Sequence, residues 1–348
     1  MKALVLADYH HLEVADRPVP VPAGGEILLR IDCTGICGSD FHGFTGENGR
    51  RRPGQIMGHE SSATIAALGP GVDEGEFPLG SHATFNPVIV PEEQLSEYRG
   101  REQHSPGKTV VGVSADYQSS FADYVVVPAR NVVLLDPVMP LYLGALIEPI
   151  AVALHAVRVG EVQEGQKAVV IGGGPIGQSV VIALQMEGVT DIVLSEPHPG
   201  RRDLVQELGA QVIGPEGGPA ADQVREIFGS PADLAIDAVG ISPTVTDALD
   251  ATRLGGTVVL VGMGSPQLDV PAFAISTAER RIVGSFTYSA RDFTDAAEWV
   301  GRHVDAVTPL VSSIVSPEQA QEAFTALASG EGPAGKILVR FTQEEENA

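Results

Sequence analysis

Hydrophobic residues in the first part of the chain come in short runs separated by glycine, proline and aspartate. The runs are ALVLA (3–7), EILLRIDC (26–33), SATIAALG (62–69), ADYVVVP (122–128) and NVVLL (131–135). Short runs rich in valine and isoleucine between turn residues are typical of β-strands. This pattern predicts a compact, mostly β domain up to about Asp136.

The pattern changes near Leu141, where apolar residues recur at helical spacing through residue 160. Beyond that point, segments of strand and helical character alternate, at 167–188, 191–197, 201–210, 211–215, 221–228, 233–240, 245–256 and 257–264. Such alternation predicts an α/β fold with a doubly wound parallel sheet. The chain then shows a strand-like run, two helical segments, a last strand and an acidic tail, at 280–286, 290–303, 317–330, 336–341 and 343–348.

Composition places the protein in a broad class. Its 348 residues, 43% of them hydrophobic, can bury a sizeable core and suit two domains. We find no apolar run long enough to cross a bilayer and no signal peptide, and two cysteines are too few for a secreted disulfide framework. We therefore expect a cytoplasmic protein. A net charge of −23 disfavours nucleic acid and anionic membranes as partners, because phosphate binding needs concentrated positive charge.

A glycine-rich segment, VVIGGGPIGQ, opens the α/β part, and its Gly172, Gly174 and Gly177 have the G-x-G-x-x-G spacing. The first glycine allows a tight turn, the second lets the backbone approach a pyrophosphate, and the third lets a helix pack on the strand. The next strand ends at Glu196, where an acid would accept hydrogen bonds from an adenosine ribose. The alternative is a plain glycine-rich turn beside a surface carboxylate, but the flanking elements favour a dinucleotide cofactor.

The charge of Glu196 favours NAD over NADP, because a carboxylate would repel a 2′-phosphate. Arg201 and Arg202 argue the other way, since their charges could neutralise that phosphate. We expect NAD.

Four residues are candidate zinc ligands: Cys37, His59, Glu60 and Glu148. Zinc accepts thiolate, imidazole and carboxylate, and a catalytic zinc keeps one position open for water or substrate. Taken singly, each residue has an ordinary explanation as a core cysteine, a structural histidine, a surface acid or an acid at the start of a helix. A disulfide between Cys33 and Cys37 is the least expected alternative in a reducing compartment. The four candidates gain weight from the motifs around them.

Five segments occur in the order found in one enzyme family: GICGSDFH (35–42), GHE (58–60), EPIAVALHAV (148–157), GGGPIG (172–177) and GGTVVLVGMG (255–264). Together they resemble the zinc-dependent medium-chain dehydrogenases, and within them the sorbitol and threonine dehydrogenase branch. The resemblance covers nearly the whole chain. It implies a GroES-like catalytic domain at 1–149, completed by 290–348, and a Rossmann NAD-binding domain at 150–289. It also implies that a secondary alcohol is oxidised by hydride transfer to NAD.

The resemblance assigns a metal site to these motifs. It implies a catalytic zinc on Cys37 and His59, with Glu60 or Glu148 and a water molecule completing the coordination. Cys33 matches no ligand position, so we expect it in the core.

The resemblance also implies a proton path and a cofactor site. Ser39 and His42 would pass the alcohol proton to solvent, and Asp40 would steady His59. The further contacts to the cofactor that the resemblance implies are at Ile176, Arg201, Val239, Val261, Gly262, Ser285 and Phe286.

One departure from the family concerns a second, structural zinc that four cysteines often hold. The matching positions are Pro91, Gln94, Glu97 and Ser105. Because no thiolate remains there, we expect at most one zinc per subunit.

Another departure concerns the substrate pocket. Sorbitol dehydrogenases carry an aromatic residue after the relay histidine and an Arg-Tyr pair near the last Rossmann strand, where this chain has Gly43, Thr287 and Tyr288. Only Tyr288 persists, and we expect it to contact substrate. A polyol or sugar-derived secondary alcohol is the first expectation. The alternatives are a threonine-type amino-alcohol dehydrogenase and a zinc-free, quinone reductase-like nucleotide binder.

Two further segments carry weaker expectations. Arg50, Arg51 and Arg52 predict a solvated loop, and the alternative is a clamp for a phosphorylated or acidic substrate. Residues 269–286 resemble the edge through which this family pairs its subunits, which implies a homodimer or homotetramer.

Overall fold

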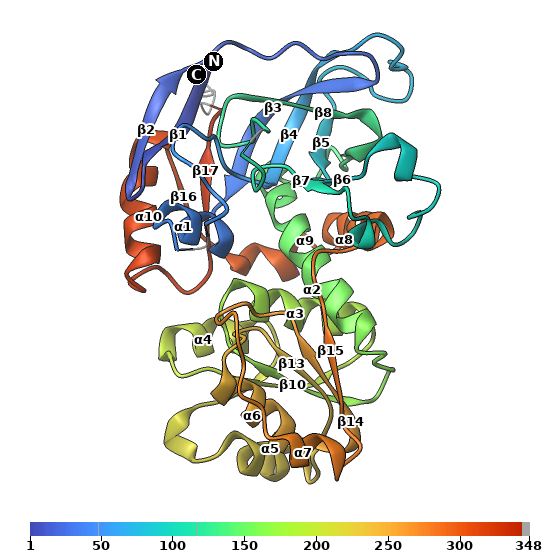
Figure 1. Ribbon diagram of the computed structural model, residues 1–348, viewed down its shortest axis with the longest axis vertical. Coiled ribbons are helices and arrows are strands. Elements are labelled where there is room, and N and C mark those ends of the chain that lie inside the picture. The colour runs from blue at the N-terminus through green and yellow to red at the C-terminus, as the bar shows by residue number, and fades with distance from the viewer. Residues whose placement is uncertain (48, 116, 343–348) are drawn as a thin grey trace. The chain divides into compact units, whose positions relative to one another are not determined.

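The computed structural model describes residues 1–47, 49–115 and 117–342 and divides the chain into two compact units (Figure 1). Unit 1 consists of Met1–Glu148 and Ser289–Ala348, and unit 2 is Pro149–Tyr288. Unit 2 is therefore an insertion in the sequence of unit 1. The acidic tail expected at 343–348 lies outside the described residues.

Unit 1 is built around one large sheet and two short ribbons. The sheet order is β16 (Val311–Val315), β17 (Lys336–Arg340), β3 (Glu26–Gly35), β4 (Glu60–Leu68), β5 (His82–Phe85) and β9 (Val132–Leu134), with β8 (Tyr124–Pro128) paired to β3. The ribbons are β1 (Lys2–Asp8) with β2 (His11–Asp16) and β6 (Val88–Ile89) with β7 (Thr109–Val110). The five runs that the sequence assigned to strands lie in β1, β3, β4, β8 and β9, which confirms the mostly β domain.

The central strand, β3, shows why this sheet forms. Its alternate residues Ile27, Leu29 and Ile31 are fully buried in one core cluster, because successive side chains of a strand point to opposite faces. Cys33 is also fully buried, in a cluster with Leu338 of the neighbouring β17. Burial raises the pKa of the Cys33 thiol to about 12. Both cysteines are free, and Cys33 is a core residue as expected.

The helices of unit 1 are α1 (Gly38–Phe44), α8 (Ala290–Arg302), α9 (Val304–Val307) and α10 (Ala320–Ala328). α8 begins at a capping box, in which the Asp292 backbone donates to Ser289 Oγ (3.2 Å) and the Ser289 backbone donates to Asp292 Oδ2 (3.0 Å). α8 and α10 confirm the two helical segments predicted late in the chain. The short α1 lies within the GICGSDFH segment, directly after β3.

Unit 2 is a six-stranded parallel sheet with helices in the connections. The strand order is β12 (Gln211–Ile213), β11 (Asp191–Ser195), β10 (Lys167–Ile171), β13 (Ala232–Asp237), β14 (Thr252–Leu260) and β15 (Arg281–Gly284). The helices within unit 2 are α3 (Pro175–Met186), α4 (Pro199–Glu207), α5 (Ala220–Phe228), α6 (Ser242–Ala251) and α7 (Ala272–Ser276). The central strands are continuous apolar runs, as expected for strands covered on both faces. The doubly wound parallel sheet is confirmed.

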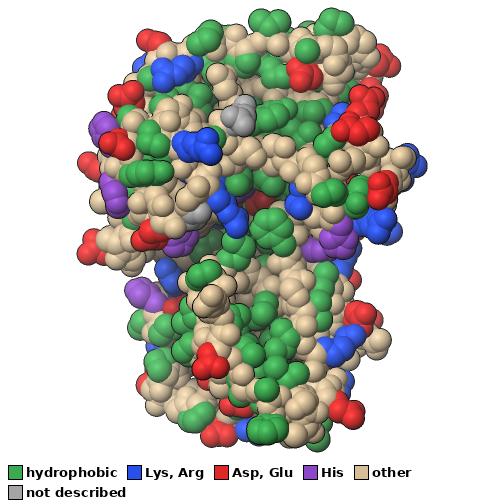
Figure 2. All heavy atoms as spheres, in the orientation of Figure 1, with side chains coloured by type: hydrophobic (Ala, Val, Ile, Leu, Met, Phe, Trp, Pro, Cys, Tyr) green, Lys and Arg blue, Asp and Glu red, His purple; other side chains and the backbone are tan. Residues whose placement is uncertain are grey.

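The edge of this sheet and its surroundings are partly apolar. β15 pairs with β14 alone among the described strands. Unit 2 also exposes large hydrophobic side chains (Figure 2), among them Phe273 at 82%, Leu254 at 72% and Met263 at 61% exposure.

One helical stretch corrects an expectation from the sequence. Leu141–Val159, which comprises η4 (Leu141–Leu146) and α2 (Ile147–Val159), is long and apolar enough to cross a membrane by length and composition. Its most apolar window is 72% buried inside the protein. The stretch is therefore explained as a core helix, whose apolar surface is covered by the fold.

Candidate active site

Three candidate ligands meet where β3 ends and β4 begins. Glu60, the first residue of β4, pairs with Gly35, the last residue of β3. Cys37 is the N-cap residue of α1, two positions beyond β3, and His59 directly precedes β4. Antiparallel pairing of two strands therefore brings together residues that are far apart in the sequence.

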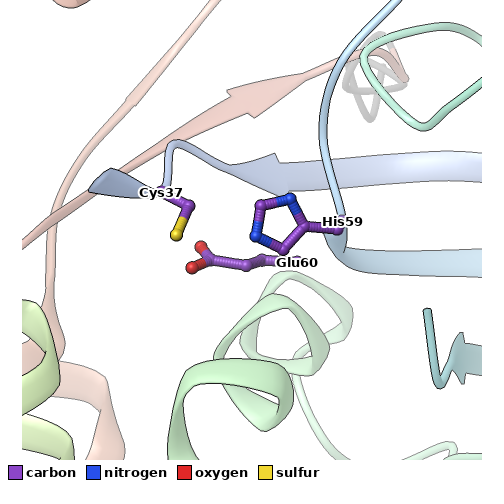
Figure 3. A group of neighbouring side chains, drawn as sticks. All are labelled: Cys37, His59 and Glu60. Carbon is purple, nitrogen blue, oxygen red and sulfur yellow. The ribbon is translucent and has the colours of Figure 1, made fainter. Parts of the chain in front are cut away.

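The ligand atoms of Cys37, His59 and Glu60 lie within 4.8 Å of one another, and Figure 3 shows the sulfur, the imidazole and the carboxylate converging. His59 is 5% exposed and Glu60 is fully buried. Thiolate, imidazole and carboxylate form a donor set that zinc accepts. No other such group of His, Cys, Asp or Glu donors occurs among the described residues. These three residues therefore fit a zinc ion.

Glu148, the other candidate acid, lies outside this group. It is the second residue of α2 and is 7% exposed. Of the two acids that the sequence left as alternatives, it is Glu60 whose carboxylate lies with Cys37 and His59 in this structure.

The imidazole of His59 lies in a strongly negative environment. Burial alone would lower its pKa, but the charges of Asp40, Cys37 and Glu148 raise that pKa to about 10. Asp40 Oδ1 lies 3.6 Å from His59 Nδ1, on the side where the sequence predicted a supporting carboxylate. A metal requires neutral imidazole, so zinc binding at this histidine must displace a proton.

A buried lysine that the sequence reasoning missed contacts Glu60. Lys336 Nζ lies 2.7 Å from Oε1 and 2.6 Å from Oε2 of Glu60. Both side chains are almost completely buried. Burial alone would lower the pKa of Lys336, but the charge of Glu60 raises it. In the sequence, this lysine is the first residue of the otherwise apolar run KILV. Nothing in that run indicates that its partner is Glu60.

The two residues predicted to carry a proton lie on α1. Ser39 and His42 are three positions apart, a spacing that puts both on one face of a helix. The His42 side chain is 51% exposed, and its Nδ1 lies 3.1 Å from Glu47 Oε2. The histidine is thus in contact with solvent, and Glu47 is a further partner that the sequence reasoning did not include.

The three arginines of the cluster differ in burial. Arg50 and Arg52 are exposed, but Arg51 is only 1% exposed. Arg51 Nη2 donates to Asp40 Oδ1 (3.1 Å) and to Ser39 Oγ (3.3 Å). Both readings of the sequence are therefore wrong for Arg51, because a buried carboxylate attracts its guanidinium into the protein.

The lobe that lacks the four cysteines is held by hydrogen bonds. Gln94 Oε1 accepts from Ser105 Oγ (2.6 Å) and from the Gly107 backbone (3.2 Å). Pro91 precedes the short helix η1 (Glu92–Gln94), and Glu97 is exposed. A hydrogen bond thus connects Gln94 and Ser105, two of the four positions that the resemblance matches to metal ligands.

The glycine-rich turn has the geometry that its spacing predicted. Gly172 has φ +100°, a value that L-residues rarely adopt. A Cβ at Gly177 would lie 1.8 Å from the Gly172 carbonyl oxygen, whereas a Cβ at Gly174 would meet nothing within 4 Å. The turn is therefore tight at its first and third glycines and open at the second, where a pyrophosphate would approach the start of α3.

Glu196 follows β11 and lies against this turn. Its Oε2 accepts from the Gly173 backbone (2.7 Å) and its Oε1 from the His198 backbone (2.8 Å). A carboxylate oxygen has two lone pairs, so each can accept one more hydrogen bond. Arg202 donates to the Glu196 carbonyl (2.8 Å) and pairs with Glu216 (2.8 Å), so part of its charge is already neutralised.

The other residues implied in cofactor binding share one edge of the sheet. Those that follow a parallel strand do so at its carboxyl end, where open α/β sheets bind ligands. They are Val239 after β13, Val261 and Gly262 after β14, and Ser285 and Phe286 after β15, while Ile176 and Arg201 lie in the first turns of α3 and α4. Tyr288, the expected substrate contact, is fully buried at the end of unit 2.

A cavity of about 770 Å³ also lies in unit 1, but it includes none of the candidate ligands. Its lining comes from the sheet and the start of η4, and includes Arg30, His82, Tyr142 and Arg340. The cavity is therefore separate from the Cys37, His59 and Glu60 group.

Two family models match the chain. Residues 23–137 match the alcohol dehydrogenase GroES-like domain, and residues 175–302 match the zinc-binding dehydrogenase model. D-xylulose reductase A of Aspergillus niger is 30% identical over 341 residues, covering 95% of this chain and 94% of that protein.

Solved structures resemble the chain over almost its whole length. 2R,3R-butanediol dehydrogenase from Bacillus subtilis has a TM-score of 0.88 at 26% identity and covers 98% of this chain and 99% of its own. Galactitol-1-phosphate dehydrogenase from Escherichia coli has a TM-score of 0.87 at 25% identity, with 98% and 100% covered. A Sinorhizobium meliloti protein of the zinc-binding dehydrogenase type, bound to NADP, has a TM-score of 0.85 at 27% identity, with 97% and 98% covered.

Proposed function

The chain belongs to the zinc-type medium-chain dehydrogenase/reductase family, and on this basis we propose that it oxidises a polyol or another sugar-derived secondary alcohol with NAD. Membership in this family makes it an oxidoreductase that uses zinc and a nicotinamide cofactor on a small-molecule alcohol. The observation that carries the proposal is the convergence of Cys37, His59 and Glu60 next to the helix that bears Ser39 and His42.

The substrate class is supported by the relatives and by the acid at the metal site. D-xylulose, butanediol and galactitol 1-phosphate, which appear in the names of similar proteins, all carry neighbouring oxygen atoms. A carboxylate beside the thiolate and imidazole is the feature that resembles the polyol branch. The zinc-free alternative is disfavoured, because that branch lacks the ligands that this chain brings together.

Each residue of the candidate active site has a separate proposed role in the reaction. Cys37, His59 and Glu60 would hold zinc, which when bound lowers the pKa of a substrate hydroxyl as a Lewis acid, while the nicotinamide accepts hydride. Ser39 would accept the hydroxyl proton and pass it toward His42, which releases it to solvent beside Glu47. Asp40 would orient the His59 ring from its Nδ1 side, so that the other ring nitrogen faces Cys37 and Glu60.

The preference for NAD rests on Glu196 and predicts a change of cofactor specificity. We expect Glu196→Gln to lower the ratio of kcat/KM with NAD to kcat/KM with NADP by about tenfold or more, since a hydrogen bond to a charged group contributes about 1.5–3 kcal/mol. Gln keeps an acceptor for only one of the two backbone N–H groups that Glu196 binds, so thermal unfolding is measured in parallel to show that the turn stays intact. An unchanged ratio would refute the assigned role of Glu196.

The zinc stoichiometry and the assembly complete the proposal. None of the four matching positions carries a thiolate, and Gln94 and Ser105 are hydrogen-bonded to each other there, which supports one zinc per subunit. The edge strand β15, which pairs with β14 alone among the described strands, supports a homodimer or homotetramer, since an open strand edge is otherwise an aggregation hazard.

The substrate class is tested with a panel of polyols, sugar phosphates and amino alcohols offered with NAD and zinc-loaded protein. We expect kcat/KM for the best polyol or sugar-derived alcohol to exceed that for threonine by about tenfold or more, because contacts to additional hydroxyl groups discriminate at that scale. Turnover of threonine alone would establish the amino-alcohol alternative. Activity that persists in metal-free protein would contradict the zinc mechanism.

A further inference from the structure

Arg51 lies beside two residues of the proposed mechanism without being near solvent. Its Nη2 lies 3.1 Å from Asp40 Oδ1 and 3.3 Å from Ser39 Oγ. Neither the Arg51 nor the Asp40 side chain is exposed to any measurable extent. One guanidinium nitrogen therefore contacts both the carboxylate behind His59 and the hydroxyl predicted to accept the substrate proton.

The backbone and the second nitrogen of Arg51 are also held in place. Tyr9 Oη donates to the Arg51 carbonyl oxygen (3.2 Å), and Arg51 Nη1 donates to the Val113 carbonyl oxygen (3.4 Å). Arginine suits such a position because its planar group presents five donors in a fixed geometry and keeps its charge when buried.

The space that Arg51 occupies exists because residue 43 is glycine. A Cβ at Gly43 would lie 2.1 Å from Cγ and 3.0 Å from Cβ of Arg51, closer than atoms can approach. Gly43 is also the position where the sorbitol dehydrogenases carry an aromatic residue. The lack of an aromatic side chain at residue 43 and the burial of Arg51 are therefore linked. The aliphatic part of the arginine packs against α1 where only glycine leaves room for it.

The charges explain what the arginine does there. Asp40 is fully buried, and burial of a polar side chain is costly unless hydrogen-bond partners accompany it. Its Oδ2 accepts from the Cys37 backbone (3.3 Å), and its Oδ1 faces both Arg51 and His59. Arg51 is thus a buried cation in direct contact with the carboxylate that lies behind His59.

We propose that Arg51 is a positioning residue, which holds the Asp40 carboxylate against His59 and the Ser39 hydroxyl in place, and that Gly43 is required to admit it. This inference rests on the proposed zinc site. The inference goes beyond that site, because it makes the affinity for zinc depend on Arg51, which is not one of the proposed ligands.

The test measures zinc release to a chelator from the full-length, zinc-loaded protein, at a temperature where circular dichroism shows each variant folded. We expect Arg51→Met to release zinc about 10- to 100-fold faster, the scale on which partners of metal ligands act. Arg51→Lys should recover part of the loss, because an ammonium retains the charge next to Asp40. Arg52→Met is the matched control, since that side chain is exposed, and it should release zinc at the wild-type rate.

Gly43 supplies a second measurement that does not depend on the Arg51→Met variant folding. Gly43→Ala should also speed zinc release, by displacing the arginine stem, but should add nothing in a protein that already carries Arg51→Ala. Wild-type zinc release from a folded Arg51→Met variant, or additive effects of Gly43→Ala and Arg51→Ala, would overturn the inference. Failure of the wild-type protein to bind zinc would instead overturn the proposed function.

Discussion

Replacing Cys37 with alanine is expected to abolish zinc binding and to lower kcat/KM by more than ~100-fold, since replacing even the outer partners of metal ligands lowers affinity or activity about 10- to 100-fold. Cys37 supplies the thiolate of a group whose other donors, His59 and Glu60, lie within 4.8 Å of it. Metal analysis of the purified protein and initial rates with NAD measure the two effects. The wild-type protein is expected to contain one zinc per subunit, and the variant none.

The chain offers a matched control for this experiment in its second cysteine. Cys33 is fully buried in the core and takes no part in the donor group. Cys33→Ala should therefore keep zinc and turnover and lose only about 1 kcal/mol or so of stability, as expected when a small buried group is removed. A Cys37→Ala protein with full zinc and full activity would refute the metal site, as would two tightly held zinc ions in the wild type.

Replacing Lys336 with methionine should destabilise the metal-free protein by about 3 to 5 kcal/mol, the usual effect of removing one partner of a buried ion pair. The ammonium of Lys336 contacts both carboxylate oxygens of Glu60, at 2.6 and 2.7 Å, and both residues are buried. Without the lysine, the charge of Glu60 is compensated only when a metal is present. The loss of stability should therefore be smaller with zinc than with a chelator.

Denaturant unfolding of both forms tests this expectation. A Lys336→Met/Glu60→Gln double variant should recover most of the stability of the metal-free protein, because the double change removes both charges. Equal losses of unfolding free energy with and without zinc would show that a bound metal does not compensate the charge of Glu60 in place of Lys336. An unchanged unfolding free energy in Lys336→Met would show that the ion pair contributes nothing.

The glycine-rich turn of unit 2 could be predicted from the sequence alone. The turn at Gly172, Gly174 and Gly177 is predictable because its three glycines act on one another over a few residues, and the structure shows the tight first and third positions and the open second one. The contact of Glu196 with that turn follows from the parallel pairing of β10 and β11, which alternation of strands and helices already implied.

The partners of the zinc ligands depend instead on contacts between distant segments. Lys336 reaches Glu60 because β17 pairs with β3 and β3 pairs with β4, a register that no local pattern encodes. Arg51 is one of three consecutive arginines, a pattern that predicts a solvated loop. Its side chain is buried because it pairs with the buried carboxylate of Asp40. The apolar stretch at Leu141–Val159 likewise shows its role only when its burial is known.

The sequence by itself determined the mostly β first part and the doubly wound sheet, because these follow from periodicity and glycine spacing. Its resemblance to the zinc-dependent medium-chain dehydrogenases implied the core position of Cys33 and the residue types of the donor group. Tertiary structure alone decided that Glu60 rather than Glu148 accompanies Cys37 and His59, that Lys336 pairs with that acid, and that Arg51 is buried against Asp40. The physical reason is that compensation of buried charge is a long-range requirement, met by whichever residue the fold brings near.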